Sequence, residues 1–231
     1  MSDPFPDILK CVCRQAIVYT ANIFTVGHAR NVAYGDPTVK DYEYHRIKEM
    51  AHQLEIAGIE RKIIDHIMQG GEDIKRSTKP EAKADWMREA MIRMNKSLDL
   101  ETRKAVREGC ACCLGGKRLK VSRGIARENE TLEERIGAAN DSKMVFGHSV
   151  EMLESGEIMV RFAPEGLDHY NCVCLPRSTR PIPITYCFCC GGHVKHHLQI
   201  ALDRDLDCTV QSSALSSGGR KPCTFTFKIK N

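Results

Sequence analysis

Closely spaced cysteines are the residues of this sequence whose type and spacing most plainly indicate chemistry. The chain has 12 cysteines among its 231 residues. Four Cys-x-Cys pairs occur, namely Cys11/Cys13, Cys110/Cys112, Cys172/Cys174 and Cys187/Cys189, and the second and fourth extend into the doublets Cys112-Cys113 and Cys189-Cys190. On an extended segment, residues two apart point to the same side, so both sulfurs of a pair can reach one ion. Thiolates are soft ligands that suit zinc, copper(I) or an iron–sulfur cluster.

Two of these pairs are placed to share a metal ion. A four-thiolate site needs two pairs brought together, and Cys172/Cys174 and Cys187/Cys189 flank one short loop. We therefore predict that Cys172, Cys174, Cys187 and Cys189 bind a metal, with zinc expected and an iron–sulfur cluster as the alternative. Possible additional ligands are Cys110, Cys112, Cys113, Cys223 and His197. The alternative for each cysteine is burial as a small apolar residue.

The stretch from Cys189 to His197 combines two cysteines with three histidines, which are the residue types most suited to nucleophilic or acid–base chemistry. If a helix starts near Gly191, then Cys190, His193 and His197 lie on one face of it. A helix N-terminus stabilises a thiolate, and a neighbouring imidazole can accept the thiol proton. This pattern predicts Cys190 as a nucleophile and His193 as its base. The same residues would equally suit a mixed Cys/His metal site or a solvated surface.

The elements that must position these residues change in character near residue 145. Residues 5–24 and 38–114 show helical spacing of apolar residues, and Thr131-Leu-Glu-Glu is typical of a capping box. Further along, the sequence predicts a hairpin around Glu154-Ser-Gly-Glu, a helix over about 191–204 and a second hairpin that ends in a strand starting at Cys223.

These elements together predict an α+β fold. A helical region, residues 1–144, would pack with a ββαββ antiparallel-sheet region, residues 145–231, which carries most cysteines and would bind the metal or ligand. In the last strand, alternation predicts that Phe225 and Phe227 are buried and that Cys223 shares their face.

Composition narrows the classes of function. The net charge is only +4, and the 34 basic and 30 acidic residues are interspersed, which argues against nucleic-acid binding. The N-terminus is acidic and broken by proline, and no stretch has the apolar length of a membrane span, so we expect a cytoplasmic protein with no membrane partner. In that reducing compartment the cysteines are expected to be thiols rather than disulfides. The sequence does not indicate an oligomeric state.

Roughly the last sixty residues resemble a known kind of module. They run Ile184-Thr-Tyr-Cys187-Phe-Cys189-Cys190-Gly-Gly, a helix, a strand, Gly218-Gly219 and Cys223-Thr-Phe-Thr-Phe-Lys-Ile. This pattern resembles the tail of an uncharacterised prokaryotic family similar to the 4-vinyl reductase domain, a small-molecule sensor module that often carries zinc.

The resemblance implies a βαββ ligand-binding fold. In it, a cysteine before the helix, Cys187 or Cys189, would approach Cys223 of the last strand. Zinc-binding members have a Glu and a Cys on the intervening strand, where this sequence has Ser212 and Leu215, with Cys208 nearby.

The sequence therefore predicts a cytosolic, cysteine-rich metal-binding protein with a small-molecule binding or sensing role. One alternative is a thiol- or metal-dependent hydrolase that uses Cys190 and His193. The other is a structural zinc protein that acts through protein partners.

Overall fold

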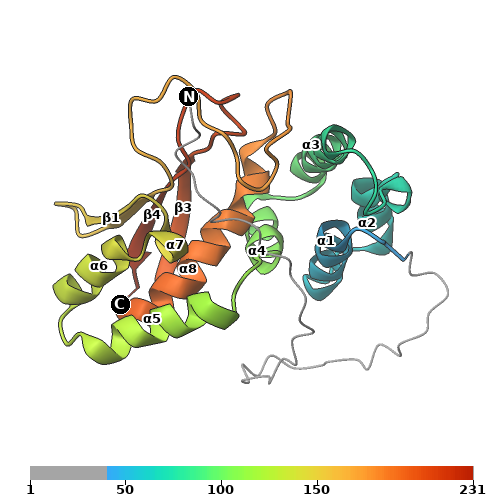
Figure 1. Cartoon of the computed structure of the whole chain (residues 1–231). Helices are drawn as coiled ribbons and strands as arrows, with labels where there is room; N and C mark the ends of the chain where they lie inside the picture. The colour runs from blue at the N-terminus through green and yellow to red at the C-terminus, as the bar shows by residue number, and fades with distance from the viewer. Residues whose placement is uncertain (1–40, 231) are drawn as a thin grey trace. The chain divides into compact units, whose positions relative to one another are not determined.

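The structure is a computed structural model that describes residues 41–230, so the predicted helix over residues 5–24 and the pair Cys11/Cys13 lie outside the described residues. The helices before the sheet are α1 (His45–Ile56), α2 (Arg61–Met68), α3 (Pro80–Ser97), α4 (Leu100–Gly109), α5 (Gly116–Glu128), α6 (Leu132–Asp141) and α7 (Lys143–Phe146), with a 3-10 turn, η1, at Gly71–Asp73 (Figure 1). The remaining elements are β1 (Ser149–Met152), β2 (Ile158–Arg161), the 3-10 turn η2 (Ile184–Cys187), α8 (Phe188–Leu202), β3 (Leu206–Ser212) and β4 (Thr224–Ile229).

Helix starts follow local side-chain chemistry. Thr131 accepts a hydrogen bond from the backbone N–H of Glu134 and the Glu134 carboxylate accepts one from Thr131, which confirms the capping box predicted for α6. Asp99 caps α4 in a similar way by accepting from the backbone N–H of Thr102 at 2.9 Å. Proline at the first position of α3 supplies a backbone angle that already suits a helix.

The four strands form one antiparallel sheet in the order β1-β2-β4-β3. Strand alternation turns Val160, Phe225 and Phe227 to one face, where all three are fully buried, as predicted for the two phenylalanines. Cys223 directly precedes β4, and its carbonyl accepts a hydrogen bond from Phe162. Helices followed by a ββαββ arrangement confirm the predicted α+β fold. The predicted division of the chain at residue 144 stays a prediction.

Helix α8 is the central element of the site. Figure 1 shows it lying along β3 and β4, with α5 beside it and α4 crossing near its N-terminal end. It begins at Phe188, directly after η2, rather than near Gly191. The glycine pair therefore lies inside the helix and does not start it. Because Cys187 and Cys189 lie on helical backbone, the expectation that they form an extended pair with both thiols on one side is wrong.

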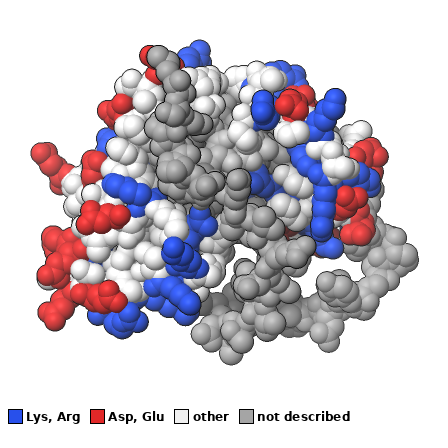
Figure 2. Space-filling view, viewed as in Figure 1, with Lys and Arg blue, Asp and Glu red and all other residues white. Residues whose placement is uncertain are grey.

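Charged side chains of both signs are mixed on the visible part of the described surface (Figure 2). Among residues 41–230, none of the helices is both long and apolar enough to cross a membrane.

Candidate metal centre

Three segments that are distant in sequence bring thiols together. The first turn of α8 carries Cys189 and Cys190, the loop before η2 carries Cys174, and the segment after α4 carries Cys112. The sulfurs of Cys174 and Cys190 are 3.7 Å apart. Cys189 contacts Cys190, and Cys112 interacts electrostatically with both Cys174 and Cys189. We call Cys112, Cys174, Cys189 and Cys190 the thiol cluster.

Contacts between the thiols shift their pKa values in opposite directions within the thiol cluster. Contacts with the Cys172 and Cys190 thiols, helped by Arg46, hold the pKa of Cys174 well below its usual range. The contact with Cys190, with Arg107 nearby, lowers the pKa of Cys189 to about 7. Contacts with Cys174 and Cys189, together with burial, raise the pKa of Cys190 well above its usual value. The cluster thus favours thiolates on Cys174 and Cys189, with Cys190 as the proton donor.

Two arginines that the sequence analysis did not single out lie beside these thiols. Arg107 is only 3% exposed, and its Nη2 donates to the Tyr186 carbonyl. Arg46 donates from Nη1 to the Cys174 carbonyl at 2.7 Å and to the Tyr186 hydroxyl at 3.1 Å. Among the described residues, the buried Nε of Arg107 has no hydrogen-bond partner.

The ionisable groups that surround these guanidinium groups are thiols and tyrosine hydroxyls. Burial would lower the pKa of Arg107, but Cys110, Cys189 and Tyr186 outweigh burial and raise it. Burial likewise opposes the charge on Arg46, and Tyr186 and Cys174 raise its pKa. A buried guanidinium is costly without a counter-charge, so both arginines favour ionised sulfurs next to them.

The two glycines after the cysteine doublet allow α8 to approach two neighbours closely. A Cβ on Gly191 would lie 2.9 Å from the Cys208 sulfur on β3. A Cβ on Gly192 would lie 2.7 Å from the backbone oxygen of Glu108 in α4. Glu108 also pairs with Lys195 of α8 at 2.8 Å. The close α4–α8 contact brings the segment after α4 beside the first turn of α8, and so places Cys112 near Cys189.

The predicted histidines bind backbone rather than the Cys190 thiol. His193 donates from Nδ1 to the Cys112 carbonyl at 2.8 Å, since a carbonyl can only accept. His197 donates from Nε2 to the Cys113 carbonyl at 3.1 Å, and its Nδ1 lies 3.0 Å from the Ser122 hydroxyl. Burial lowers the pKa of His193 and lowers that of His197 to about 4. The assignment of Cys190 and His193 as nucleophile and base stays a prediction.

The other predicted ligands lie around the thiol cluster. Cys172 is buried, and its sulfur accepts a hydrogen bond from the Cys174 N–H at 3.3 Å. Cys187 faces Ser213 and Cys223, and burial raises its pKa. Burial also raises the pKa of Cys110 to about 11, and its thiol contacts the Val106 carbonyl. The structure thus places Cys172, Cys174, Cys187 and Cys189 in one region, where they interact electrostatically, and the Cys187 thiol is also hydrogen-bonded to Ser213.

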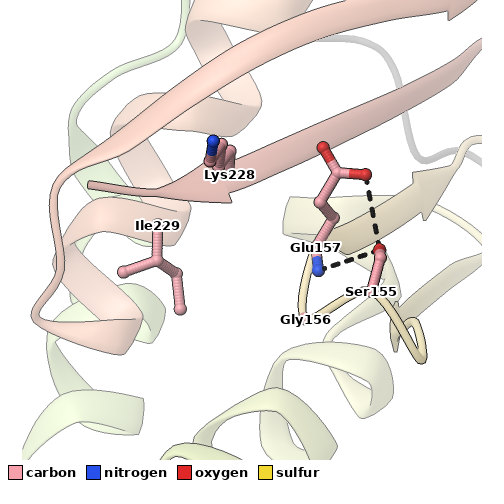
Figure 3. A pocket seen from close by; sticks show the side chains of 5 residues that line it. All are labelled: Ser155, Gly156, Glu157, Lys228 and Ile229. Carbon is pink, nitrogen blue, oxygen red and sulfur yellow. Dashed lines mark hydrogen bonds between the residues drawn. The ribbon is translucent and has the colours of Figure 1, made fainter. Parts of the chain in front are cut away.

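In the described part of the chain, no group of three or more His, Cys, Asp or Glu side chains has an arrangement that could hold a metal ion. Two surface hollows lie elsewhere. One, of about 390 Å³, lies between the β1–β2 turn and the end of β4, where the Ser155 hydroxyl bonds Glu157 opposite Lys228 and Ile229 (Figure 3). The other, of about 150 Å³, is lined by His169, Arg180 and Gly219, among others. Neither hollow is lined by a member of the thiol cluster.

The fold and these thiols define a cysteine-rich α+β protein. A family model matches residues 41–226, so the chain belongs to that family, which is described as a family of unknown function (DUF6144). No curated protein and no solved structure matches the chain significantly.

Proposed function

We propose that this protein binds a single divalent metal ion, zinc, through Cys112, Cys174, Cys189 and Cys190. The observation that carries the proposal is the separation of 3.7 Å between the Cys174 and Cys190 sulfurs. Around a tetrahedral zinc ion with Zn–S bonds of about 2.3 Å, neighbouring sulfurs lie about 3.8 Å apart. The two thiols already have the spacing of ligands that share one ion.

Charge supports the same conclusion. Four thiolates around a divalent cation carry two net negative charges, and the neighbouring Arg46 and Arg107 provide two positive charges without a carboxylate among their main electrostatic partners. Neutral thiols would leave the buried Arg107 guanidinium uncompensated. An anionic metal–thiolate centre therefore matches the surroundings better than a set of protonated thiols.

The choice of ligands follows from mutual proximity. Cys112 interacts with both Cys174 and Cys189, whereas Cys172 interacts with Cys174 and Cys187. Cys187 also interacts electrostatically with Cys174 and Cys189, but its thiol is engaged by a hydrogen bond with Ser213 and lies beside Cys223, so we leave it outside the proposed ligand set. This proposal keeps Cys174 and Cys189 from the set predicted from the sequence and replaces Cys172 and Cys187 with Cys112 and Cys190. Because no group of three ligands is arranged for a metal among the described residues, the proposal requires the four side chains to move into a tetrahedron as the ion binds, with loss of the thiol protons.

Other parts of the sequence-based prediction remain proposals beside this one. An iron–sulfur cluster is the alternative cofactor, although thiols that are in contact fit ligands of one ion better than ligands spread over several irons. The resemblance to the 4-vinyl reductase domain is supported by the electrostatic contact of Cys187 with Cys223. Four further points stay predictions: a small-molecule binding or sensing role, a cytoplasmic location, hydrolase activity, and a structural role through protein partners.

Metal analysis of protein purified without oxygen tests the proposal. We expect about one zinc ion per chain and a colourless protein. Cys174→Ala should lose the metal, while the matched control Cys208→Ala should keep it, because Cys208 lies on the sheet with its sulfur against Gly191. A brown protein that contains iron would favour the cluster instead. A metal-free wild type, or equal metal content in both variants, would refute the proposed centre.

A further inference from the structure

The described residues hold a second group of functional side chains, which the zinc proposal does not use: three histidines on one face of α8. We propose that His193 and His197 are positioning residues that fix the Cys112–Cys113 segment so that Cys112 can serve as a metal ligand. This inference rests on the proposed function, because it assigns the histidines a role at that same metal centre.

Hydrogen bonds from α8 to consecutive carbonyls carry the inference. His193 binds the carbonyl of Cys112, and His197 binds the carbonyl of Cys113. His196, the residue before His197, interacts with the backbone of Leu114, the residue after Cys113. A segment between α4 and α5 that has no regular hydrogen-bonding pattern of its own is thereby attached to a helix whose first turn carries Cys189 and Cys190.

Backbone strain shows that this attachment holds the segment in an unfavourable conformation. Cys113 has φ of 62°, in the left-handed region that a residue with a side chain seldom occupies. Such a conformation is unfavourable for a residue with a side chain, and it persists only where surrounding contacts maintain it. The Cys113 carbonyl is the group that His197 binds, so the hydrogen bond acts directly on the strained residue.

Cys112 needs such support more than the other members of the thiol cluster. Its side chain is exposed, whereas Cys174, Cys189 and Cys190 are half-buried. The positive φ of the next residue, Cys113, turns the chain at this point. By contrast, Cys189 and Cys190 are fixed by the backbone of α8 itself.

The ring nitrogens of His193 and His197 are already engaged, which separates their role from direct ligation, whereas the buried Nε2 of His196 has no hydrogen-bond partner among the described residues. The Nδ1 of His193 carries its proton toward Cys112, and the two nitrogens of His197 face Cys113 and Ser122. Ser122 and His197 are both 0% exposed, so this network is internal. The Nε2 of His197 must carry a proton to bind the Cys113 carbonyl, and the Ser122 hydroxyl, which also lies 3.1 Å from the Arg118 carbonyl, packs beside Nδ1.

Cobalt titration of the full chain tests this role, since Co²⁺ occupies thiolate sites and its spectrum reports the number of sulfur ligands. We expect His193→Leu and His197→Leu each to weaken cobalt binding by about 10- to 100-fold, the usual effect of removing an outer partner of a ligand. The bound spectrum should change from four sulfur ligands to three. His197→Gln, which keeps an N–H donor, should restore most of the affinity.

The control is Arg135→Met, which removes an arginine that binds the carbonyls of Ala126, Asn129 and Leu202. It should lower the unfolding temperature of the metal-free protein without changing cobalt affinity. If the histidine variants bind cobalt with wild-type affinity and a four-sulfur spectrum, the positioning role is wrong and the metal centre stands. If the wild type binds no cobalt at all, both proposals fall.

Discussion

Cysteines on the sheet and in the first turn of α8 differ in the pKa of their thiols. Cys208, on the inner face of the sheet, is 2% exposed, and burial raises its pKa to about 12. Cys189, in the first turn of α8, has a pKa lowered to about 7, because it contacts Cys190 and lies near Arg107. The difference shows that the neighbours of a thiol, and not its place in the core alone, decide whether it is suited to bind a metal.

Removing the metal should have the largest effect on the difference between the thiol cluster and Cys208. Adding a chelator under anaerobic conditions should lower the free energy of unfolding by several kcal/mol, since a metal that binds only the folded chain stabilises it by mass action. An alkylating reagent should then label Cys112, Cys174, Cys189 and Cys190 together, while Cys208 stays unlabelled. Mass spectrometry of the peptides gives the order of labelling. Equal labelling of Cys208 and Cys174 before and after chelation would erase the difference between the two regions.

A smaller effect should follow from changing the arginine beside the thiols. Arg107→Met keeps most of the side-chain volume but removes the charge, so zinc affinity should fall about tenfold, or about 1.4 kcal/mol. Arg107→Lys should lose less, because it keeps the charge. The measurement is a competition titration with a coloured chelator. Unchanged affinity in Arg107→Met would show that the guanidinium does not balance the charge of the centre.

Adding one methyl group at either glycine of α8 tests the two regions separately, because Gly192 contacts α4 near the thiol cluster and Gly191 contacts Cys208 on the sheet. In Gly192→Ala the new methyl meets the Glu108 backbone, which cannot move alone, so α4 and the Cys112 segment should shift. We expect a loss of roughly 2 kcal/mol in stability together with weaker zinc binding. Gly191→Ala meets the Cys208 sulfur instead, so Cys208→Ala should relieve the strain. Chemical denaturation of Gly191→Ala, of Cys208→Ala and of the double variant measures the coupling free energy between the two positions. A coupling free energy of zero would contradict the contact.

The smallest expected effect lies away from both sets of thiols. Thr131→Ala removes the cap of α6 and should cost about 1 kcal/mol of unfolding free energy with no change in zinc affinity. Thermal unfolding and zinc competition on the same sample check this. A change in affinity would mean that the centre responds to overall stability, which would weaken every affinity argument above.

Local patterns in the sequence predicted much of the fold. The capping box at Thr131, the hairpin around Ser155 and the buried alternation of Phe225 and Phe227 depend on neighbouring residues, and the structure contains all three. The predicted start of α8 near Gly191 is wrong, because two consecutive glycines are typical of a helix boundary but here lie inside the helix, which begins at Phe188. Their actual role, close contact with β3 and α4, depends on tertiary packing that no local pattern reveals.

The candidate site was less accessible from the sequence. The cysteines were identifiable, and spacing placed Cys174 near Cys189 across one short loop. Spacing could not choose Cys112, which approaches these thiols through the close contact of α4 with α8. Arg46 lies 128 residues from Cys174, so spacing gave no signal for it. Arg107 offered one, since it lies three residues before Cys110 and therefore on the same side of α4 at its C-terminal end.

X-ray absorption at the zinc edge tests the central claim most directly, because it reports the number and type of atoms bound to the metal. The account predicts four sulfur atoms at about 2.3 Å in the protein as purified, with no nitrogen or oxygen in the first shell. In Cys112→Ser the spectrum should change to three sulfurs and one lighter atom. A wild-type spectrum with two or fewer sulfurs, or with imidazole nitrogen bound to the metal, would contradict a centre built from Cys112, Cys174, Cys189 and Cys190.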